Sequence, residues 1–136
     1  MITLLDTTLR DGEQTSGVSF AKQEKMAIAR LLLEDLRVDR IEVASARVSD
    51  GEFETVRNIA RWAAQNGYED KVEVLGFVDG QVSLEWVKNA GVKVMNLLCK
   101  GSHKHCTMQL GKKPEEHIAD ITQVVTLAHE WGVGIN

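Results

Sequence analysis

The feature that most constrains the fold of this chain is a repeated order of strand, loop and helix. Short apolar runs typical of buried strands lie at residues 2–5, 40–44, 71–78 and 93–98. Segments with helical spacing of apolar residues, or with helix start and stop signals, follow them at residues 21–36, 49–67, 84–90 and 114–131. A fifth strand is predicted at residues 133–136. Repetition at about 30 residues per unit is typical of βαβ units, so the sequence predicts an α/β fold with a parallel sheet.

The predicted second helix has clear signals at both ends. Ser49 and Glu52 form the pattern of a capping box, in which each side chain accepts from the backbone N–H of the other residue. Gly67 stands where helices commonly end in the left-handed conformation. Pro114, followed by two glutamates, likewise predicts the first turn of the last helix.

Two ways of closing such a sheet are open: a doubly wound sheet and a (β/α)8 barrel. A full barrel takes about 250 residues, whereas this chain has 136. The length favours the open sheet if the chain is whole, and it does not discriminate if the chain is a piece. The strand predicted at residues 133–136 has only just begun at the last residue, which indicates a piece.

Composition excludes several classes of protein. The chain has 16 Lys and Arg against 20 Asp and Glu, a formal net charge of −4, and lacks the concentrated basic stretch that binds nucleic acid. No apolar run approaches the roughly 18 residues of a membrane-spanning helix. The first residues lack the regions of a secretory signal. Cys99 and Cys106 do not make a disulfide framework, so we expect a cytoplasmic protein.

The loop after the first strand is the best candidate for chemistry, because functional groups of parallel α/β folds gather at the C-terminal ends of strands. It reads DTTLRDGEQ over residues 6–14 and places Arg10 directly beside Asp11. A carboxylate suits a hard divalent cation, and a guanidinium stabilises developing negative charge. The alternative is a solvated loop with an internal ion pair.

Glu42 is an acid within the apolar second strand. A carboxylate there needs a partner if it is buried, and Arg10 at the end of the neighbouring strand is a candidate. The alternative is that Glu42 lies on a strand face that reaches solvent.

The loop after the fourth strand, residues 100–106, carries two histidines and a cysteine. His103, His105 and Cys106 are candidates for part of a zinc site, but Lys104 opposes a cation and no second ligand pair follows at zinc-finger spacing. The alternative is a loop histidine that binds substrate or nothing. No GxGxxG, GxxxxGK[ST] or GxSxG occurs, so nucleotide-phosphate and serine-hydrolase sites are unsupported.

The segment LLDTTLRDGEQTSGVSF, residues 4–20, closely resembles the opening of the acyl-CoA-dependent condensing enzymes of the DRE-TIM metallolyase superfamily. The resemblance continues through IEVASARVSDGEFETV, VLGFVDG, NLLCKGS and KKPEEHIADI, and so covers essentially the whole chain. The segments ASARVSDGEFE and GFVDG are more similar to citramalate synthases than to typical isopropylmalate synthases. The resemblance implies a (β/α)8 TIM barrel, with residues 1–136 as the N-terminal half of its catalytic domain: about four βα units and the start of strand five.

The resemblance also implies roles for individual residues. Arg10 matches the family's arginine that stabilises the enolate or alkoxide, Glu42 matches the glutamate that orients it, and Asp11 matches the first metal ligand. Asn96 stands where isopropylmalate synthases usually carry histidine. The positions that the resemblance assigns to substrate binding are Gln14, Leu75, Asn96, Leu98, Ser102 and His105, and leucines at 75 and 98 would crowd a branched keto acid and suit pyruvate.

The reaction implied is a metal-assisted Claisen-type condensation of acetyl-CoA with a 2-keto acid in amino-acid biosynthesis of the isoleucine or leucine type. Pyruvate, giving citramalate, is favoured. We expect a divalent cation (Mg, Mn or Zn) and a homodimer. The family's His-x-His and its catalytic glutamate fall beyond Asn136, so we expect this chain to be inactive alone. The alternatives are a 2-isopropylmalate synthase acting on oxoisovalerate, a non-catalytic half-barrel that self-associates through its edge strands, and an open-sheet ligand-binding domain.

Overall fold

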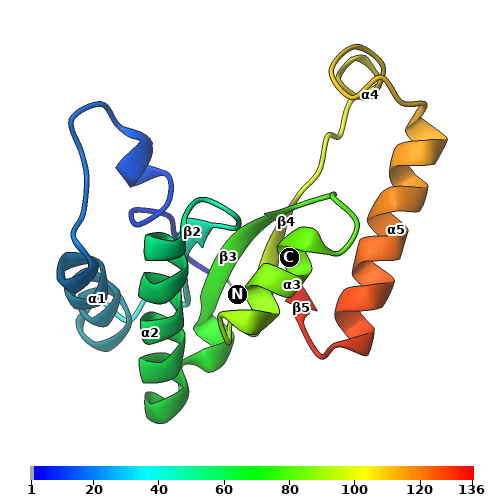
Figure 1. The fold of residues 1–136 in the computed structure, drawn as a ribbon. Helices are drawn as coiled ribbons and strands as arrows, with labels where there is room; N and C mark the ends of the chain where they lie inside the picture. The colour runs from blue at the N-terminus through cyan, green and yellow to red at the C-terminus, as the bar shows by residue number, and fades with distance from the viewer. Residues whose placement is uncertain (1) are drawn as a thin grey trace.

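A computed structural model describes residues 2–136 as a curved, fully parallel sheet of five strands (Figure 1). Along the sheet the strands follow their order in the chain: β1 (Leu5–Asp6), β2 (Arg40–Ser45), β3 (Val72–Phe77), β4 (Val94–Leu98) and β5 (Gly134–Ile135). Every neighbouring pair is parallel, as the βαβ pattern predicts. Within the described residues, β1 and β5 form the two edges of the sheet.

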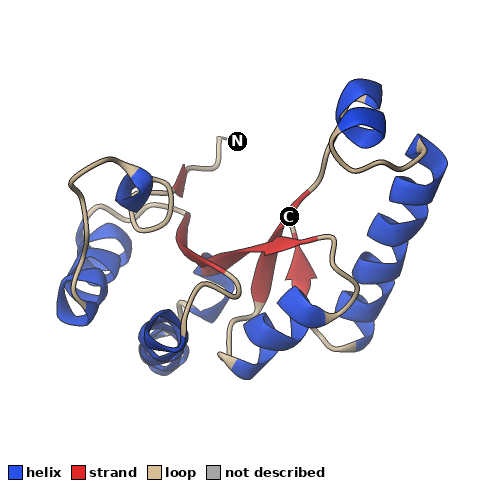
Figure 2. Ribbon diagram, turned by 45° about the horizontal axis from the view of Figure 1, so that its top comes forward, coloured by secondary structure: helices blue, strands red, loops and turns tan. Residues whose placement is uncertain are grey.

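Helices connect the strands and lie along one side of the sheet (Figure 2). They are α1 (Lys22–Arg30), α2 (Asp50–Asn66), α3 (Val82–Asn89), α4 (His103–Met108) and α5 (Pro114–Glu130). A doubly wound sheet reverses its strand order part-way and carries helices on both faces, whereas a barrel adds each strand beside the previous one. The sequential order therefore identifies part of a (β/α)8 barrel, and the open-sheet alternative is wrong.

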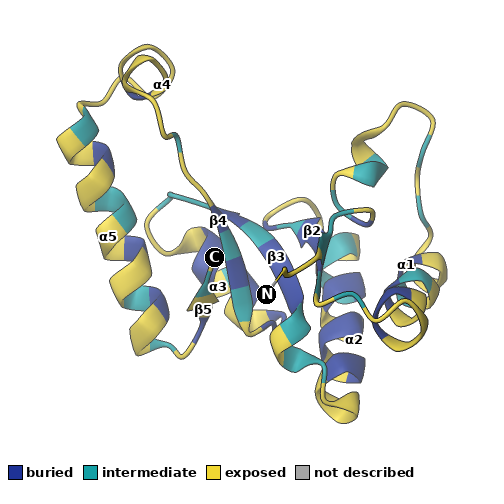
Figure 3. Cartoon of the chain, turned by 180° about the vertical axis from the view of Figure 1, so that it is seen from behind, coloured by how far each residue is buried: buried dark blue, intermediate teal, exposed yellow. Residues whose placement is uncertain are grey.

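The hydrophobic core lies between the sheet and the helices. Ile41 and Val43 of β2, Val74 of β3 and Met95 of β4 are fully buried against that layer. Burial is concentrated on the central strands and on the sides of α2 and α3 that face them (Figure 3). Because side chains alternate between the two faces of a strand, the residues between these apolar ones occupy the inner, concave face.

The inner face carries buried polar groups. Glu42 and Glu73 are paired in the β2–β3 register, and both are fully buried. Arg40 Nη1 donates to Glu73 Oε1 at 2.9 Å, and Asn136 Nδ2 donates to the same oxygen at 2.6 Å. Among the described residues, Glu73 Oε2 and Arg40 Nε are buried without a hydrogen-bond partner. The concave side thus carries buried charged groups among apolar residues such as Leu75 and Val94.

The first strand is shorter than the apolar run that predicts it. Strand pairing covers only Leu5 and Asp6, whereas Ile2 and Leu4 are 88% and 60% exposed. β1 has a single neighbour, so its apolar side chains lack a second strand to cover them. Residue 4 is held by its backbone: Leu4 N donates to Asp39 Oδ2 at 2.7 Å.

The helix predicted at residues 21–36 does not continue as a regular α-helix. After Arg30 the chain forms a π-helical turn at Leu31–Asp35, in which Leu36 N donates to Leu31 O at 2.9 Å. Leu32 and Leu33 lie in the core, while Leu36, at the end of the predicted helix, is 69% exposed. Residues 29, 32, 33 and 36 would share one face of a regular helix, and the wider turn moves Leu36 off that face.

The remaining helices are close to prediction, with two corrections. α2 begins at Asp50 after Ser49, whose Oγ accepts from Glu52 N at 3.1 Å, and ends at Gly67 with φ +75°. The predicted hydrogen bond from Ser49 N to the Glu52 carboxylate is wrong, because that carboxylate contacts Lys25 instead. The segment predicted as the loop 100–106 contains the start of α4, since Ser102 Oγ accepts from His105 N at 3.2 Å and caps a short helix.

We predict that Gly76→Ala destabilises the fold by about 1–3 kcal/mol, because overpacking forces core atoms to move. A Cβ on Gly76 would lie 2.2 Å from Met95 Sδ and 2.7 Å from Met95 Cγ, in a fully buried side chain. Urea unfolding followed by circular dichroism measures the change. Gly101→Ala is the control, since nothing lies within 4 Å of its added Cβ. Equal unfolding midpoints for the two variants would contradict the prediction.

Candidate active site

The loop that follows β1 is organised by two residues at the end of the strand. The backbone N–H groups of Arg10, Asp11 and Gly12 all donate to Thr7 O, at 3.1, 2.7 and 3.2 Å. Asp6 accepts from Thr8 N at 2.9 Å and from Thr8 Oγ1 at 3.2 Å. A 3-10 helix, Gly12–Gln14, follows directly. The turn therefore fixes the direction in which the Arg10 side chain leaves the backbone.

Arg10 forms a forked contact with Glu42. Its Nε donates to Glu42 Oε1 at 2.7 Å and its Nη2 donates to Oε2 at 3.3 Å. Asn96 Nδ2, from β4, donates to Glu42 Oε2 at 3.2 Å. The Glu42 side chain is 0% exposed and the Arg10 side chain 18% exposed. The structure thus pairs these residues, so the alternative in which Glu42 reaches solvent is wrong.

Asp11 contacts the Arg10 guanidinium through a different nitrogen from those that contact Glu42. We call Arg10, Asp11, Glu42 and Asn96 the Arg10 group. Asp11 Oδ1 accepts from Arg10 Nη1 at 2.8 Å, and the Asp11 side chain is 60% exposed. Within residues 2–136, no group of three or more His, Cys, Asp or Glu side chains could hold a metal ion. A divalent cation takes several oxygen ligands, so the described residues do not make a complete site for it. Asp11 offers one carboxylate.

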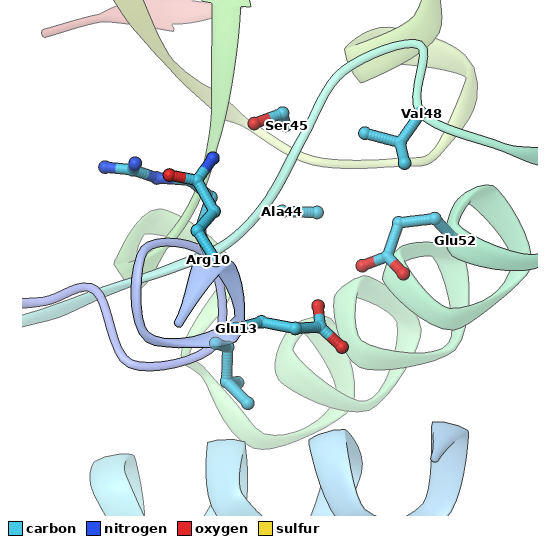
Figure 4. Close-up of a pocket in the computed structure, with 8 residues that line it drawn as sticks. Arg10, Glu13, Ala44, Ser45, Val48 and Glu52 are labelled. Atoms are coloured by element: carbon cyan, nitrogen blue, oxygen red, sulfur yellow. The ribbon is translucent and has the colours of Figure 1, made fainter. Parts of the chain in front are cut away.

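A cavity of about 190 Å³ lies beside Arg10, between the loop, the end of β2 and the start of α2 (Figure 4). Gln14 lines this cavity with Arg10, Glu13, Ser45 and Glu52. The structure therefore places Gln14 in the same cavity as Arg10, and its role in substrate binding stays a prediction. The polar lining, which includes one guanidinium and two carboxylates, lies at the C-terminal end of the sheet, where parallel α/β proteins carry their functional groups.

The other predicted substrate-binding residues are dispersed. Leu75 is the register partner of Asn96, and Leu98, two residues further along β4, pairs with Phe77. Leu98 is 43% exposed and lines a separate cavity of about 150 Å³ together with Lys100 and His117 among others. The structure therefore places Leu75 beside the Arg10 group and Leu98 further toward the end of the strands.

Ser102 and His105 lie at the start of α4, where they contact each other through the helix cap. Both are exposed, and α4 stands away from the sheet in Figure 1. In the part of the chain that the structure describes, no hydrogen bond or ion pair connects either residue to Arg10 or Glu42. Their predicted role in substrate binding stays a prediction.

The histidine and cysteine residues of α4 do not converge. His103 and His105 are two positions apart on a helix and so do not share a face. Cys106 is buried, and its Sγ lies 3.6 Å from Lys100 O.

His117, buried on α5, accepts from Lys100 N through Nε2 at 3.2 Å, which the sequence did not indicate. Partial burial raises the pKa of the Cys99 thiol above its usual value.

Sequence reasoning missed a buried ion cluster behind the loop. Lys25, on α1, is only 2% exposed and contacts Glu13 and Glu52. Burial raises the pKa of Glu13, but hydrogen bonds from Lys25 and from Phe20 N and the Lys25 charge outweigh it, so the net pKa lies below its usual value. A lysine in an amphipathic helix is normally solvated, and only the two flanking acids, far apart in sequence, explain its burial.

The fold and this site define the class of protein: a parallel (β/α) barrel segment with an arginine–carboxylate group at the C-terminal end of its strands. A family model described as HMGL-like matches residues 1–135, and the chain belongs to that family, within the DRE-TIM superfamily. No helix in residues 2–136 combines the length and apolar character needed to cross a membrane.

Two kinds of curated relative are similar to the chain. It is 36% identical over 129 residues to a 2-isopropylmalate synthase of Oceanobacillus iheyensis, covering 95% of this chain and 25% of that protein. It is 34% identical over 134 residues to an (R)-citramalate synthase of Methanocaldococcus jannaschii, covering 98% of this chain and 26% of that protein. The chain therefore spans about a quarter of the length of these relatives, and both synthase names are represented.

Solved structures support the fold. The crystal structure of an HMG-CoA lyase from Bacillus subtilis superposes with a TM-score of 0.70 at 20% identity, over 98% of this chain and 44% of that chain. An HMG-CoA lyase from Acinetobacter baumannii, solved in complex with coenzyme A and 3-methylmalate, gives a TM-score of 0.68 at 18% identity, over 100% of this chain and 44% of that chain. The truncated-barrel prediction is confirmed.

We predict that Arg10→Met destabilises the chain by about 3 kcal/mol, because it leaves the buried Glu42 carboxylate without its cationic partner. Asp11→Asn is the matched control at the other end of the same guanidinium. Its side chain is largely exposed, so the change in the free energy of unfolding is expected within about 0.5 kcal/mol. Urea unfolding of both variants tests the difference, and similar losses would argue against a dominant Arg10–Glu42 pair.

Proposed function

We propose that this chain forms part of an enzyme that condenses acetyl-CoA with a 2-keto acid, with pyruvate as the favoured acceptor. The observation that carries the proposal is the Arg10 guanidinium, fixed by buried Glu42 at the end of the barrel strands. The names of the relatives, which include both 2-isopropylmalate and citramalate synthases, support this chemistry. Because the chain spans a quarter of those proteins, the activity is proposed for the whole barrel.

Arg10 would act on developing negative charge. A guanidinium has five N–H donors, and contacts with Glu42 and Asp11 use three of them. The two others make no hydrogen bond among the described residues. They would donate to the oxygen that becomes negative as a base from outside residues 1–136 takes a proton from the thioester methyl and as the new carbon–carbon bond forms at the keto carbon. The keto oxygen then takes up a proton. Water then cleaves the thioester and releases CoA as the free thiol. Glu42 keeps the guanidinium in one orientation, and Asn96 keeps Glu42 in place.

Asp11 is the one metal ligand that we propose within this chain. Its carboxylate is exposed and adjacent to Arg10, so a bound divalent cation would lie next to the guanidinium. Such a cation polarises carbonyl oxygens and so assists the same charge development. The further ligands would come from outside residues 2–136, since the described residues offer no cluster that could complete the site.

The activity is tested by joining residues 1–136 to the corresponding remainder of the Oceanobacillus iheyensis relative. Release of free thiol from acetyl-CoA should depend on pyruvate in the fusion, whereas residues 1–136 alone should give none above the background rate. Arg10→Gln should lower kcat by roughly 10²–10³-fold, since it removes a charge donor to the transition state. Arg57→Gln, on the exposed side of α2, is the control. A fully active Arg10→Gln fusion would overturn the assigned role.

The acceptor keto acid depends on the strand ends that line the site. Both synthase names occur among the relatives, so oxoisovalerate is the second candidate. Leu75, the register partner of Asn96, is the residue that we propose limits the space for a branched side chain.

We predict that Leu75→Ala in the same fusion shifts the ratio of kcat/KM for oxoisovalerate over that for pyruvate upward by at least about tenfold, the scale that one or two methylenes provide. Val125→Ala, on the outer side of α5, should leave the ratio unchanged. Steady-state kinetics with both keto acids measures it. If the parent fusion already prefers oxoisovalerate, then oxoisovalerate replaces pyruvate as the proposed acceptor.

A further inference from the structure

The strongest unexplained feature outside the Arg10 group is the buried lysine on α1. Lys25 Nζ lies 2.5 Å from Glu13 Oε2 and also contacts Glu52 Oε1, while the lysine side chain is only 2% exposed. A buried ammonium is costly unless its charge and its donors are matched. Here two carboxylates surround it, and their side chains are 27% and 18% exposed. We call Lys25, Glu13 and Glu52 the Lys25 cluster.

The Lys25 cluster connects three parts of the fold. Glu13 lies in the 3-10 helix Gly12–Gln14, Lys25 in the first turns of α1, and Glu52 in the first turn of α2. In Figure 4 the carboxylates of Glu13 and Glu52 point toward one another across the cavity that Arg10 also lines. The cluster therefore lies directly behind the loop that carries Arg10 and Asp11.

Few other polar contacts hold this side of the loop. Thr15, Ser16 and Gly17 are exposed, and Glu13 Oε1 accepts from Phe20 N at 3.0 Å, which closes the segment on itself. Among the described hydrogen bonds and ion pairs of residues 13–20, those to Lys25 are the ones that reach α1 or α2. Without them the 3-10 helix would be held only through the residues on either side of it: Leu9 and Arg10 before it, and Phe20 after it, which packs against the core.

We infer that Lys25 is a positioning residue: through Glu13 and Glu52 it holds the loop bearing Arg10 and Asp11 against the helical layer. That Lys25 affects catalysis rests on the proposed function. That Lys25 holds the loop in place does not, because it follows from the contacts within this chain. Glu13 is three residues after Arg10, so a shift of the 3-10 helix moves the backbone from which the guanidinium extends. Small displacements of a catalytic group lower rates strongly.

The first test is hydrogen exchange of residues 1–136, read residue by residue by NMR. Glu13→Gln removes one charge and leaves Lys25 paired with Glu52, so the fold is retained. We expect the amides of Asp11, Gly12 and Gln14 to exchange about ten- to a hundredfold faster, as expected for loss of one charge-assisted bond, with the amides of β3 unchanged. Lys25→Met should accelerate the same amides, and the double variant should exchange no faster than the faster single variant.

Glu54→Gln is the matched control, because Glu54 forms an exposed pair with Arg57 on the same helix, at 3.5 Å. It should leave the loop amides unchanged. Equal acceleration in the loop and in β3 would show a general stability role and overturn the inference, as would unchanged loop amides in Glu13→Gln.

The second test separates this inference from the proposed function. In the fusion, Glu13→Gln should lower kcat by at least about tenfold with a smaller change in KM for pyruvate, because misorientation of Arg10 affects the transition state more than binding. A parent fusion without activity, combined with fast loop exchange in Glu13→Gln, would contradict the proposed function and leave the positioning role supported. If the loop amides exchange faster in Glu13→Gln but kcat is unchanged, the role of Lys25 in catalysis is overturned.

Discussion

The structure depends on one buried carboxylate. Glu42 lies within the apolar β2 strand with no exposed surface, and an ionised group there is tolerated only when its oxygens are matched. Arg10 supplies two donors from the loop after β1, and Asn96 supplies a third from β4. The Glu42 side chain thereby connects β2 to β4 and to the loop after β1, and it sets the direction of the Arg10 guanidinium. The orientation of the candidate active site follows from the requirement that Glu42 be neutralised.

A second buried charge supports the same loop from behind. Lys25 contacts Glu13 and Glu52 within the helical layer, while Arg10 contacts Glu42 on the inner face. The loop is therefore held at two places by ion pairs of opposite polarity: a buried acid on one side and a buried base on the other. Charged groups on a rigid scaffold are favourable for catalysis, because their orientation is set before a substrate arrives.

Local patterns predicted much of this fold, and tertiary contacts account for the rest. The α2 boundaries followed from Ser49 and Gly67, whereas the pairing of buried Glu42 with Arg10 was one of two alternatives that an acid in an apolar strand left open. The choice between open sheet and barrel did not follow from periodicity, since both consist of the same βαβ units. Lys25 was missed because its partners Glu13 and Glu52 are distant in sequence, and α4 was missed because its capping serine lies among residues with no apolar periodicity.

Two polar atoms on the concave face are buried without a partner. Glu73 Oε2 and Arg40 Nε are already removed from water but make no hydrogen bond among the described residues. Each atom therefore already carries a desolvation cost of about 1–3 kcal/mol in this structure. An apolar surface laid over the inner face would leave that cost as it is. A donor brought to Glu73 Oε2 and an acceptor brought to Arg40 Nε would remove it, so the two atoms are a reserve of stability for any polar contact made at this end of the strands.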